Sequence, residues 1–240
     1  MIPNFSNFEE EGPGVEADLP PLPPVKRFFV IFGRKFIKLL WLNALFLLTC
    51  IPVVTVGASL CGLARVCRKF SLEEPCFAFS EYFDGFKAGF RRGLLPGVCC
   101  TIWVAVLTAE LLYLFAQPLS GEQIAMFVPA IVLSGVFLIM QFYFWNMLDC
   151  LDLPVRAVYK NALFLTVLGI LRNIPLVIGI IAVFWLFTHV PLSLFLLLFM
   201  PFSQICYLIT FTCHPVIERF IINPYYAREA DETESEEKDE

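Results

Sequence analysis

Residues 94–147 read LLPGVCCTIWVAVLTAELLYLFAQPLSGEQIAMFVPAIVLSGVFLIMQFYFWNM and contain two long apolar runs, 94–115 and 124–147. A run of about 20 apolar residues is long enough to cross the roughly 30 Å hydrocarbon core of a bilayer as a helix. The gap between the two runs, 117–123, contains no Lys or Arg. Because short cytoplasmic loops of membrane proteins are enriched in Lys and Arg, this gap is predicted to lie outside the cell.

The same pattern extends over the whole chain. Its 17 Lys and Arg residues occur in alternate gaps between apolar runs or, like Lys38 and Arg65, at the end of a run that adjoins such a gap, so a single threading places all of them on the cytoplasmic side. The first two runs are short and are separated by Ile51-Pro52, so we expect a tight helical hairpin that turns near Pro52–Gly57 with both ends inside. The apolar runs predict about six spans: 36–50, 55–66, 94–115, 124–147, 173–187 and 192–213.

The composition agrees with a membrane protein. The chain is 58% hydrophobic and 16% charged, whereas an ordinary soluble domain has about 25% charged residues. We therefore predict an all-α, polytopic transmembrane bundle over residues 25–222, in the cell membrane, with both termini cytoplasmic. The acidic segments 1–24 and 223–240 are predicted to be disordered tails.

The tails also account for the net charge of −5. Without them the chain is basic, and basic loops lie naturally beside anionic lipid headgroups. The lipid bilayer is therefore the expected partner, and no nucleic-acid partner is expected. The sequence does not indicate an oligomeric state.

One cytoplasmic segment, 77–92, has the pattern of an amphipathic helix lying in the membrane interface. Aromatic residues fall on one helical face, and most of the charged residues fall elsewhere. The candidate residues of this interfacial helix are Phe79, Phe83, Phe86, Phe90, Lys87, Arg91 and Arg92.

Strongly polar side chains at membrane depth are the other candidates for function. Glu110 is the only acid well inside a predicted span, and it suggests either a proton or cation relay or a side chain that reaches the headgroups or pairs inside the bundle. The amides either hydrogen-bond between helices or line a small polar cavity. The candidate intramembrane residues are Asn43, Glu110, Gln141, Asn146 and Gln204. Near the cytoplasmic end, Asp149 and Asp152 are expected either to cap the helix after Pro154 or to bind a partner loop.

Motifs of catalysis are missing from the sequence. It contains no Gly-rich phosphate loop, no His-Glu-x-x-His and no Gly-x-Ser-x-Gly, which mark common nucleotide, metal and hydrolase sites. With 2 His in the chain, little is available for acid–base chemistry. We expect a non-catalytic protein without a cofactor or bound metal.

Four segments together resemble a known family. WLN at 41–43, IPVVTVG at 51–57, FDGFKAGFRR at 83–92 and KNAL at 160–163 are similar to the pattern of the YesL-type family, small bacterial integral membrane proteins of unassigned function. The resemblance covers roughly residues 26–222. Such proteins often occur beside carbohydrate-uptake genes of Gram-positive bacteria, so the resemblance implies an accessory or regulatory component that works with a carbohydrate transporter or a membrane sensor. The alternative is a stand-alone small transporter or channel for a small solute or ion.

Overall fold

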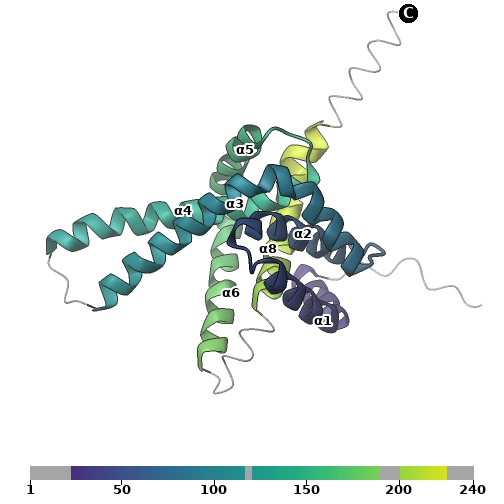
Figure 1. Cartoon of the computed structure of the whole chain (residues 1–240), viewed down its shortest axis with the longest axis horizontal. Coiled ribbons are helices and arrows are strands. Elements are labelled where there is room, and N and C mark those ends of the chain that lie inside the picture. The colour runs from purple at the N-terminus through teal and green to yellow at the C-terminus, as the bar shows by residue number, and fades with distance from the viewer. Residues whose placement is uncertain (1–22, 117–120, 190–200, 226–240) are drawn as a thin grey trace, which may run out of the picture.

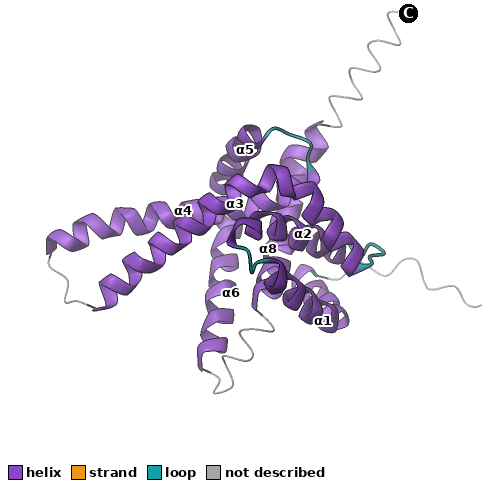
Figure 2. Cartoon of the chain, in the orientation of Figure 1, coloured by secondary structure: helices purple, strands orange, loops and turns teal. Residues whose placement is uncertain are grey.

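The computed structural model describes residues 23–116, 121–189 and 201–225. Within them the chain is helical throughout apart from short connections, and no strand occurs there (Figures 1 and 2), which confirms the all-α prediction. The elements in chain order are α1 (Pro24–Thr49), η2 (Val53–Thr55), α2 (Val56–Ser71), α3 (Ala78–Ala116), α4 (Gly121–Cys150), α5 (Val155–Leu168), α6 (Ile170–His189), α8 (Pro201–Ile217) and the π-helical η3 (Glu218–Ile222).

The predicted tails lie almost entirely outside the described residues. Helix α1 begins at Pro24, and the helical conformation at the C-terminal end extends to Tyr225.

Within the described residues, 3 helical segments are long and apolar enough to cross a bilayer: Ala78–Leu114, Ala125–Cys150 and Phe202–Tyr225. A fourth span is possible if α5 and α6, which meet at 90°, are counted as one bent segment. Helices α1 and α2 are not among these segments. Helix α2 has 16 residues, about 24 Å at ~1.5 Å per residue, and α1 carries Arg34, Lys35 and Lys38 in its middle. The predicted number of about six spans is therefore not confirmed.

The predicted hairpin of the first two apolar runs is present as α1, η2 and α2. Side-chain hydroxyls hold its turn together. The Thr55 hydroxyl donates to the carbonyl oxygens of Thr49 at 2.5 Å and Pro52 at 2.7 Å. The Ser59 hydroxyl donates to the Thr49 hydroxyl at 3.0 Å, and the Thr49 hydroxyl also bonds to that of Tyr82 on α3. Thr55 of the IPVVTVG segment thus closes the turn, and Thr49 connects the turn to a third helix.

Helix α2 lies at the centre of the molecule and is buried along most of its length, with α1, α3, α4 and α8 packed around it. Glycines explain how α3 comes so close to it. Helix α3 carries a glycine at every fourth position over residues 85–97. A Cβ added at Gly97 would lie 2.5 Å from the Cα and the backbone N of Gly57, and one added at Gly57 would overlap the carbonyl oxygen of Gly93. The two backbones are therefore in direct contact, as in the small-residue interfaces of membrane helices.

Helix α3 corrects the prediction of a separate interfacial helix. The predicted helix 77–92 and the predicted span 94–115 form one helix of 39 residues that continues through Pro96. A proline inside a helix removes one hydrogen bond and favours a kink or a break. Here the glycine contacts of Gly93 and Gly97 hold the helix against α2 on both sides of Pro96. The aromatic segment is therefore continuous with the second half of α3 and is not a separate helix.

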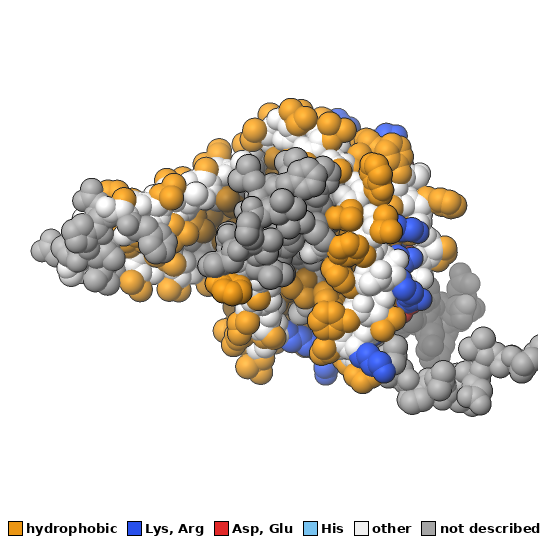
Figure 3. Space-filling model, turned by 90° about the horizontal axis from the view of Figure 1, so that it is seen from below, with side chains coloured by type: hydrophobic (Ala, Val, Ile, Leu, Met, Phe, Trp, Pro, Cys, Tyr) orange, Lys and Arg blue, Asp and Glu red, His pale blue; other side chains and the backbone are white. Residues whose placement is uncertain are grey.

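The second half of α3 and the first half of α4 run side by side as an arm that projects from the rest of the molecule (Figure 1). Aromatic pairs join the two helices, with ring centroids 4.8 Å apart for Trp103 and Phe137 and 5.8 Å apart for Tyr113 and Phe127. The outward surface of the arm is apolar, and Figure 3 shows hydrophobic side chains along it. This surface suits contact with lipid acyl chains. Lys and Arg gather at the opposite end of the molecule, around α2, the start of α3 and the α4–α5 loop, which we call the wide end.

Candidate functional site

A group of charged side chains lies where α2, α3 and the end of α4 meet. We call it the charged junction; it consists of Arg65, Arg68, Arg92, Asp149 and Asp152. At its centre is Asp149, whose side chain is only 2% exposed. Its Oδ1 accepts a hydrogen bond from Arg65 Nε at 2.8 Å, and its Oδ2 accepts one from Arg68 Nη2 at 2.9 Å. A carboxylate buried to this extent requires such partners, because an unpaired buried charge is very costly.

Arg92 fixes the loop that leaves α4. Its Nη1 lies 3.1 Å from Asp152 Oδ1, and its Nη2 donates to the carbonyl oxygen of Leu151 at 3.1 Å and to that of Leu153. One guanidinium on α3 therefore holds three consecutive residues between α4 and α5. A planar guanidinium can do this because it carries several N–H donors in a rigid fork.

The prediction that Asp149 and Asp152 cap the helix after Pro154 is wrong, because both side chains pair with arginines instead. The N-cap of α5 is Pro154, with no side-chain hydrogen bond to the first turn. The basic partners of the two aspartates are instead 60 to 84 residues away in the sequence. Spacing along the chain cannot reveal such pairs. The sequence still contains one indication of these ion pairs. An acid at the end of a long apolar run needs a basic partner from another segment.

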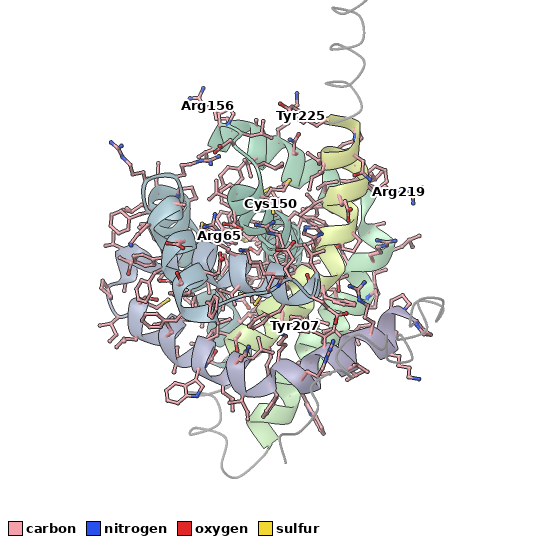
Figure 4. All side chains as sticks on the ribbon, turned by 90° about the vertical axis from the view of Figure 1, so that its right-hand side faces the viewer. Arg65, Cys150, Arg156, Tyr207, Arg219 and Tyr225 are labelled. Atoms are coloured by element: carbon pink, nitrogen blue, oxygen red, sulfur yellow. The ribbon has the colours of Figure 1, made fainter. Side chains whose placement is uncertain are left out.

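The charged junction borders a cavity of about 270 Å³. Arg65, Arg92, Asp149 and Asp152 line it together with the small residues Ala88 and Gly89 of α3. In Figure 4, Arg65 and Cys150, a further lining residue, lie near the middle of the view, whereas Arg156 and Arg219 lie at its edge. We call this space the charged cavity.

A second group of charges connects α1 to the loop after α2. Glu73 pairs with Arg27 Nε at 3.4 Å and with Arg34. Its backbone φ of 61° lies in the left-handed region, which is unfavourable for a residue with a Cβ. The hydrogen bond from Arg34, together with the charges of Arg34 and Arg27, holds the pKa of Glu73 below its usual range. These ion pairs help to keep the loop in this conformation.

Among the predicted polar residues, Asn43 connects two helices. It is fully buried, and its Oδ1 accepts a hydrogen bond from the backbone N–H of Ser203 at 3.1 Å. The Ser203 hydroxyl donates in turn to the carbonyl oxygen of Leu39 at 2.8 Å. The sequence left two roles open for Asn43, a hydrogen bond between helices or the lining of a polar cavity. The structure shows the first, since Asn43 joins α1 to the start of α8.

The structure does not bring the other candidates together. Gln141 is buried near the Tyr159 hydroxyl, but its amide has no hydrogen bond of ordinary geometry within the described residues. Among the described residues, the side chain of Asn146 donates to the carbonyl oxygen of Phe142 in its own helix, at 2.8 Å, and to no other group. Glu110 lies far along the arm, half-buried, and Gln204 is half-buried on α8. None of these residues lines the charged cavity.

The aromatic row of the predicted interfacial helix is present on α3. The ring centroids of Phe79 and Phe83 are 4.9 Å apart, those of Phe83 and Phe86 are 6.4 Å apart, and those of Phe86 and Phe90 are 5.9 Å apart. Phe79 is 69% exposed and Phe90 is 41% exposed. Among the basic residues of the segment, Lys87 and Arg91 are exposed, whereas Arg92 belongs to the charged junction.

The contrast between two buried asparagines gives a prediction. Asn43→Leu is expected to destabilise the protein by about 1–3 kcal/mol, because it leaves the buried N–H of Ser203 without its acceptor. Asn146→Leu is expected to be close to neutral, since Oδ1 of Asn146 is buried without a partner in the described part of the chain. Thermal unfolding of the purified variants in detergent measures both. Equal losses in the two variants would contradict the interhelical role of Asn43.

Comparison with known proteins adds one match. Residues 39–111 match the family described as "Protein of unknown function, DUF624". No curated protein and no solved structure matches the chain. The matched segment runs from α1 to the arm and includes the hairpin turn, the glycine contacts, Arg65 and Arg92, but it ends before Asp149. The chain is therefore similar to this family in its first helices, over residues 39–111.

Proposed function

We propose that this protein is a non-catalytic component of the cell membrane that works as an accessory or regulatory subunit beside a carbohydrate-uptake system. The observation that carries the proposal is the separation of polar from apolar surface. Charged and hydrogen-bonding side chains gather at the wide end around α2, the start of α3 and the α4–α5 loop. The arm beyond them is covered by apolar side chains. A partner protein would find specific contacts at the wide end.

The wide end is taken to be cytoplasmic because its Lys and Arg residues follow the enrichment that is typical of cytoplasmic loops. The exposed residues Phe79 and Phe90 stand there on the same helix as the exposed Lys87 and Arg91. Exposed aromatic and basic side chains in one place are typical of protein contact sites. We therefore place the partner contact on the first half of α3.

The link to carbohydrate uptake rests on the resemblance to the YesL-type family. The match of residues 39–111 to a family of unknown function includes three of the four segments that carry this resemblance, at 41–43, 51–57 and 83–92. It supports the assignment without naming a substrate.

Deletion of the gene in its native host tests the proposal. We expect the uptake of labelled sugar to change several-fold in the deletion strain and to be restored by the wild-type chain. Phe79→Glu together with Phe90→Glu should fail to restore it, although both side chains are exposed and the folded protein should be made in normal amounts. Ile102→Ala, on the exposed apolar face of the arm, is the matched control and should restore uptake. Unchanged uptake after deletion would overturn the accessory role.

A stand-alone transporter or channel is the second candidate. It is favoured by the buried amide atoms of Gln141 and by Asn146 Oδ1, which lack hydrogen-bond partners within the described residues, because unsatisfied buried polar atoms call for a functional or structural reason. Under this alternative, the purified chain alone in liposomes should move a solute, and Glu110→Gln should change the rate. The accessory role predicts no transport by the purified chain.

A further inference from the structure

The charged cavity has the features of a binding site for a small molecule. Its volume of about 270 Å³ is close to the lower end of the roughly 300–1,000 Å³ that ligand pockets occupy. Space remains there because α3 contributes only Ala88 and Gly89 to the wall between the arginines. The ligand must therefore be small, and its chemistry is decided by the charged groups around it.

The acidic groups of the cavity are already engaged with arginines or with solvent. Both oxygens of Asp149 already accept hydrogen bonds, from Arg65 and from Arg68. The side chain of Asp152 is fully exposed, so its charge is largely solvated. The cavity lining carries two guanidiniums and two carboxylates. The guanidinium of Arg68, which pairs with Asp149 from outside the lining, leaves the charged junction with a net positive charge.

The basic groups, in contrast, keep unused donors. Arg65 is held to Asp149 through Nε at 2.8 Å, and its terminal amino groups make no hydrogen bond to any residue that the structure describes. Arg92 also lines the cavity and is fixed by Asp152 and by the carbonyls of the α4–α5 loop, while its Nε makes no hydrogen bond to any residue that the structure describes. Two oriented guanidiniums around one space can bind an oxyanion with several hydrogen bonds, because the planar fork of Arg matches phosphate and carboxylate geometry.

We propose that the charged cavity binds a small oxyanion, namely the phosphate group of a small phosphorylated solute, between Arg65 and Arg92. This site does not depend on the accessory role proposed above, since it rests only on the residues of the cavity. Binding would also act on the α4–α5 loop, because the same Arg92 holds Leu151, Asp152 and Leu153.

Thermal unfolding of the purified full chain, in a neutral detergent and a phosphate-free buffer, tests the proposal. The probes are inorganic phosphate, glucose 6-phosphate, acetate and uncharged glucose. We expect a saturable rise in the unfolding temperature with inorganic phosphate and with glucose 6-phosphate, and no rise with glucose. A response to phosphate alone identifies the free anion as the ligand, and a stronger response to glucose 6-phosphate identifies the ester.

Variants locate the site. Ala88→Leu should fill the cavity, because Ala88 is exposed and lines it; we expect at least tenfold weaker binding with an unchanged unfolding temperature in the absence of ligand. Arg92→Lys keeps the charge but loses the fork and should also weaken binding at least tenfold. Arg34→Lys, in the ion pair with Glu73 outside the cavity, is the matched control and should bind as the wild type does.

Three results would overturn the site. The first is the absence of a saturable response to phosphate and to its ester. The second is an equal response in Ala88→Leu and the wild type, which would indicate a general salt effect. The third is a response to glucose or acetate as strong as that to phosphate.

Discussion

Gly57→Ala is expected to lower the stability of the helical core by about 1–3 kcal/mol, and by more if the helices cannot shift. The added methyl group would overlap the carbonyl oxygen of Gly93 on α3. Because the neighbour is backbone, no side-chain rotation can make room, and α2 and α3 must separate. We expect the unfolding temperature of the detergent-purified variant to fall by roughly 2–12 °C, at about 2–4 °C for each kcal/mol in a chain of this size.

Gly135→Ala is the matched control. Gly135 also lies inside a helix, but a Cβ added there would meet no atom within 4 Å. Alanine is a better helix former than glycine by about 1 kcal/mol, so this variant should be as stable as the wild type or slightly more stable. If Gly57→Ala unfolds at the same temperature as Gly135→Ala, the close approach of α2 and α3 is not correct.

Asp149→Ala is expected to cost about 3 kcal/mol. Removing one partner of a buried ion pair typically costs about 3–5 kcal/mol, because the remaining charge is left uncompensated. The lower value applies because Arg65 and Arg68 keep 24% and 22% of their side chains exposed, so water can solvate part of the charge. Thermal unfolding measures the loss, and limited proteolysis at the α4–α5 loop shows whether the damage is local.

Asp152→Ala provides the comparison. Asp152 also pairs with an arginine, but its side chain is fully exposed, and exposed ion pairs contribute at most about 1 kcal/mol. We expect the unfolding temperature to stay close to that of the wild type, as for most surface substitutions. Similar losses for the two aspartates would show that burial of Asp149 does not decide its contribution.

The sequence predicts the class of fold because its signal is local. Apolar runs, base-free gaps and the Pro52 turn indicate helices, spans and the α1–α2 hairpin without knowledge of any distant contact. The predicted break between residues 92 and 94 failed for the opposite reason. Pro96 suggests the start of a helix, and only the packing of Gly93 and Gly97 against α2 shows that the helix is continuous.

The candidate site was harder to predict than the fold. Asn43, Gln141 and Glu110 are candidates in the sequence because they are polar at membrane depth, but they lie apart from the charged cavity. Arg65 and Arg68 looked like ordinary cytoplasmic bases at the end of an apolar run. Their pairing with Asp149 spans more than 80 residues, so it exists only in the folded chain. A regular spacing of glycines at 85, 89, 93 and 97 was the available clue that α3 meets another helix there.

The unbroken course of α3 has a mechanical consequence. A helix of 39 residues is about 58 Å long when it is measured along its own course at ~1.5 Å per residue, nearly twice the thickness of a hydrocarbon core of ~30 Å. One end, around Tyr113, is expected to lie among the lipids, and the other packs against α2 at Gly85–Gly97. Because the helix is continuous between the two ends, a change of bilayer thickness or of lateral pressure that tilts the lipid-facing half is expected to reach Arg92 and the loop that it holds.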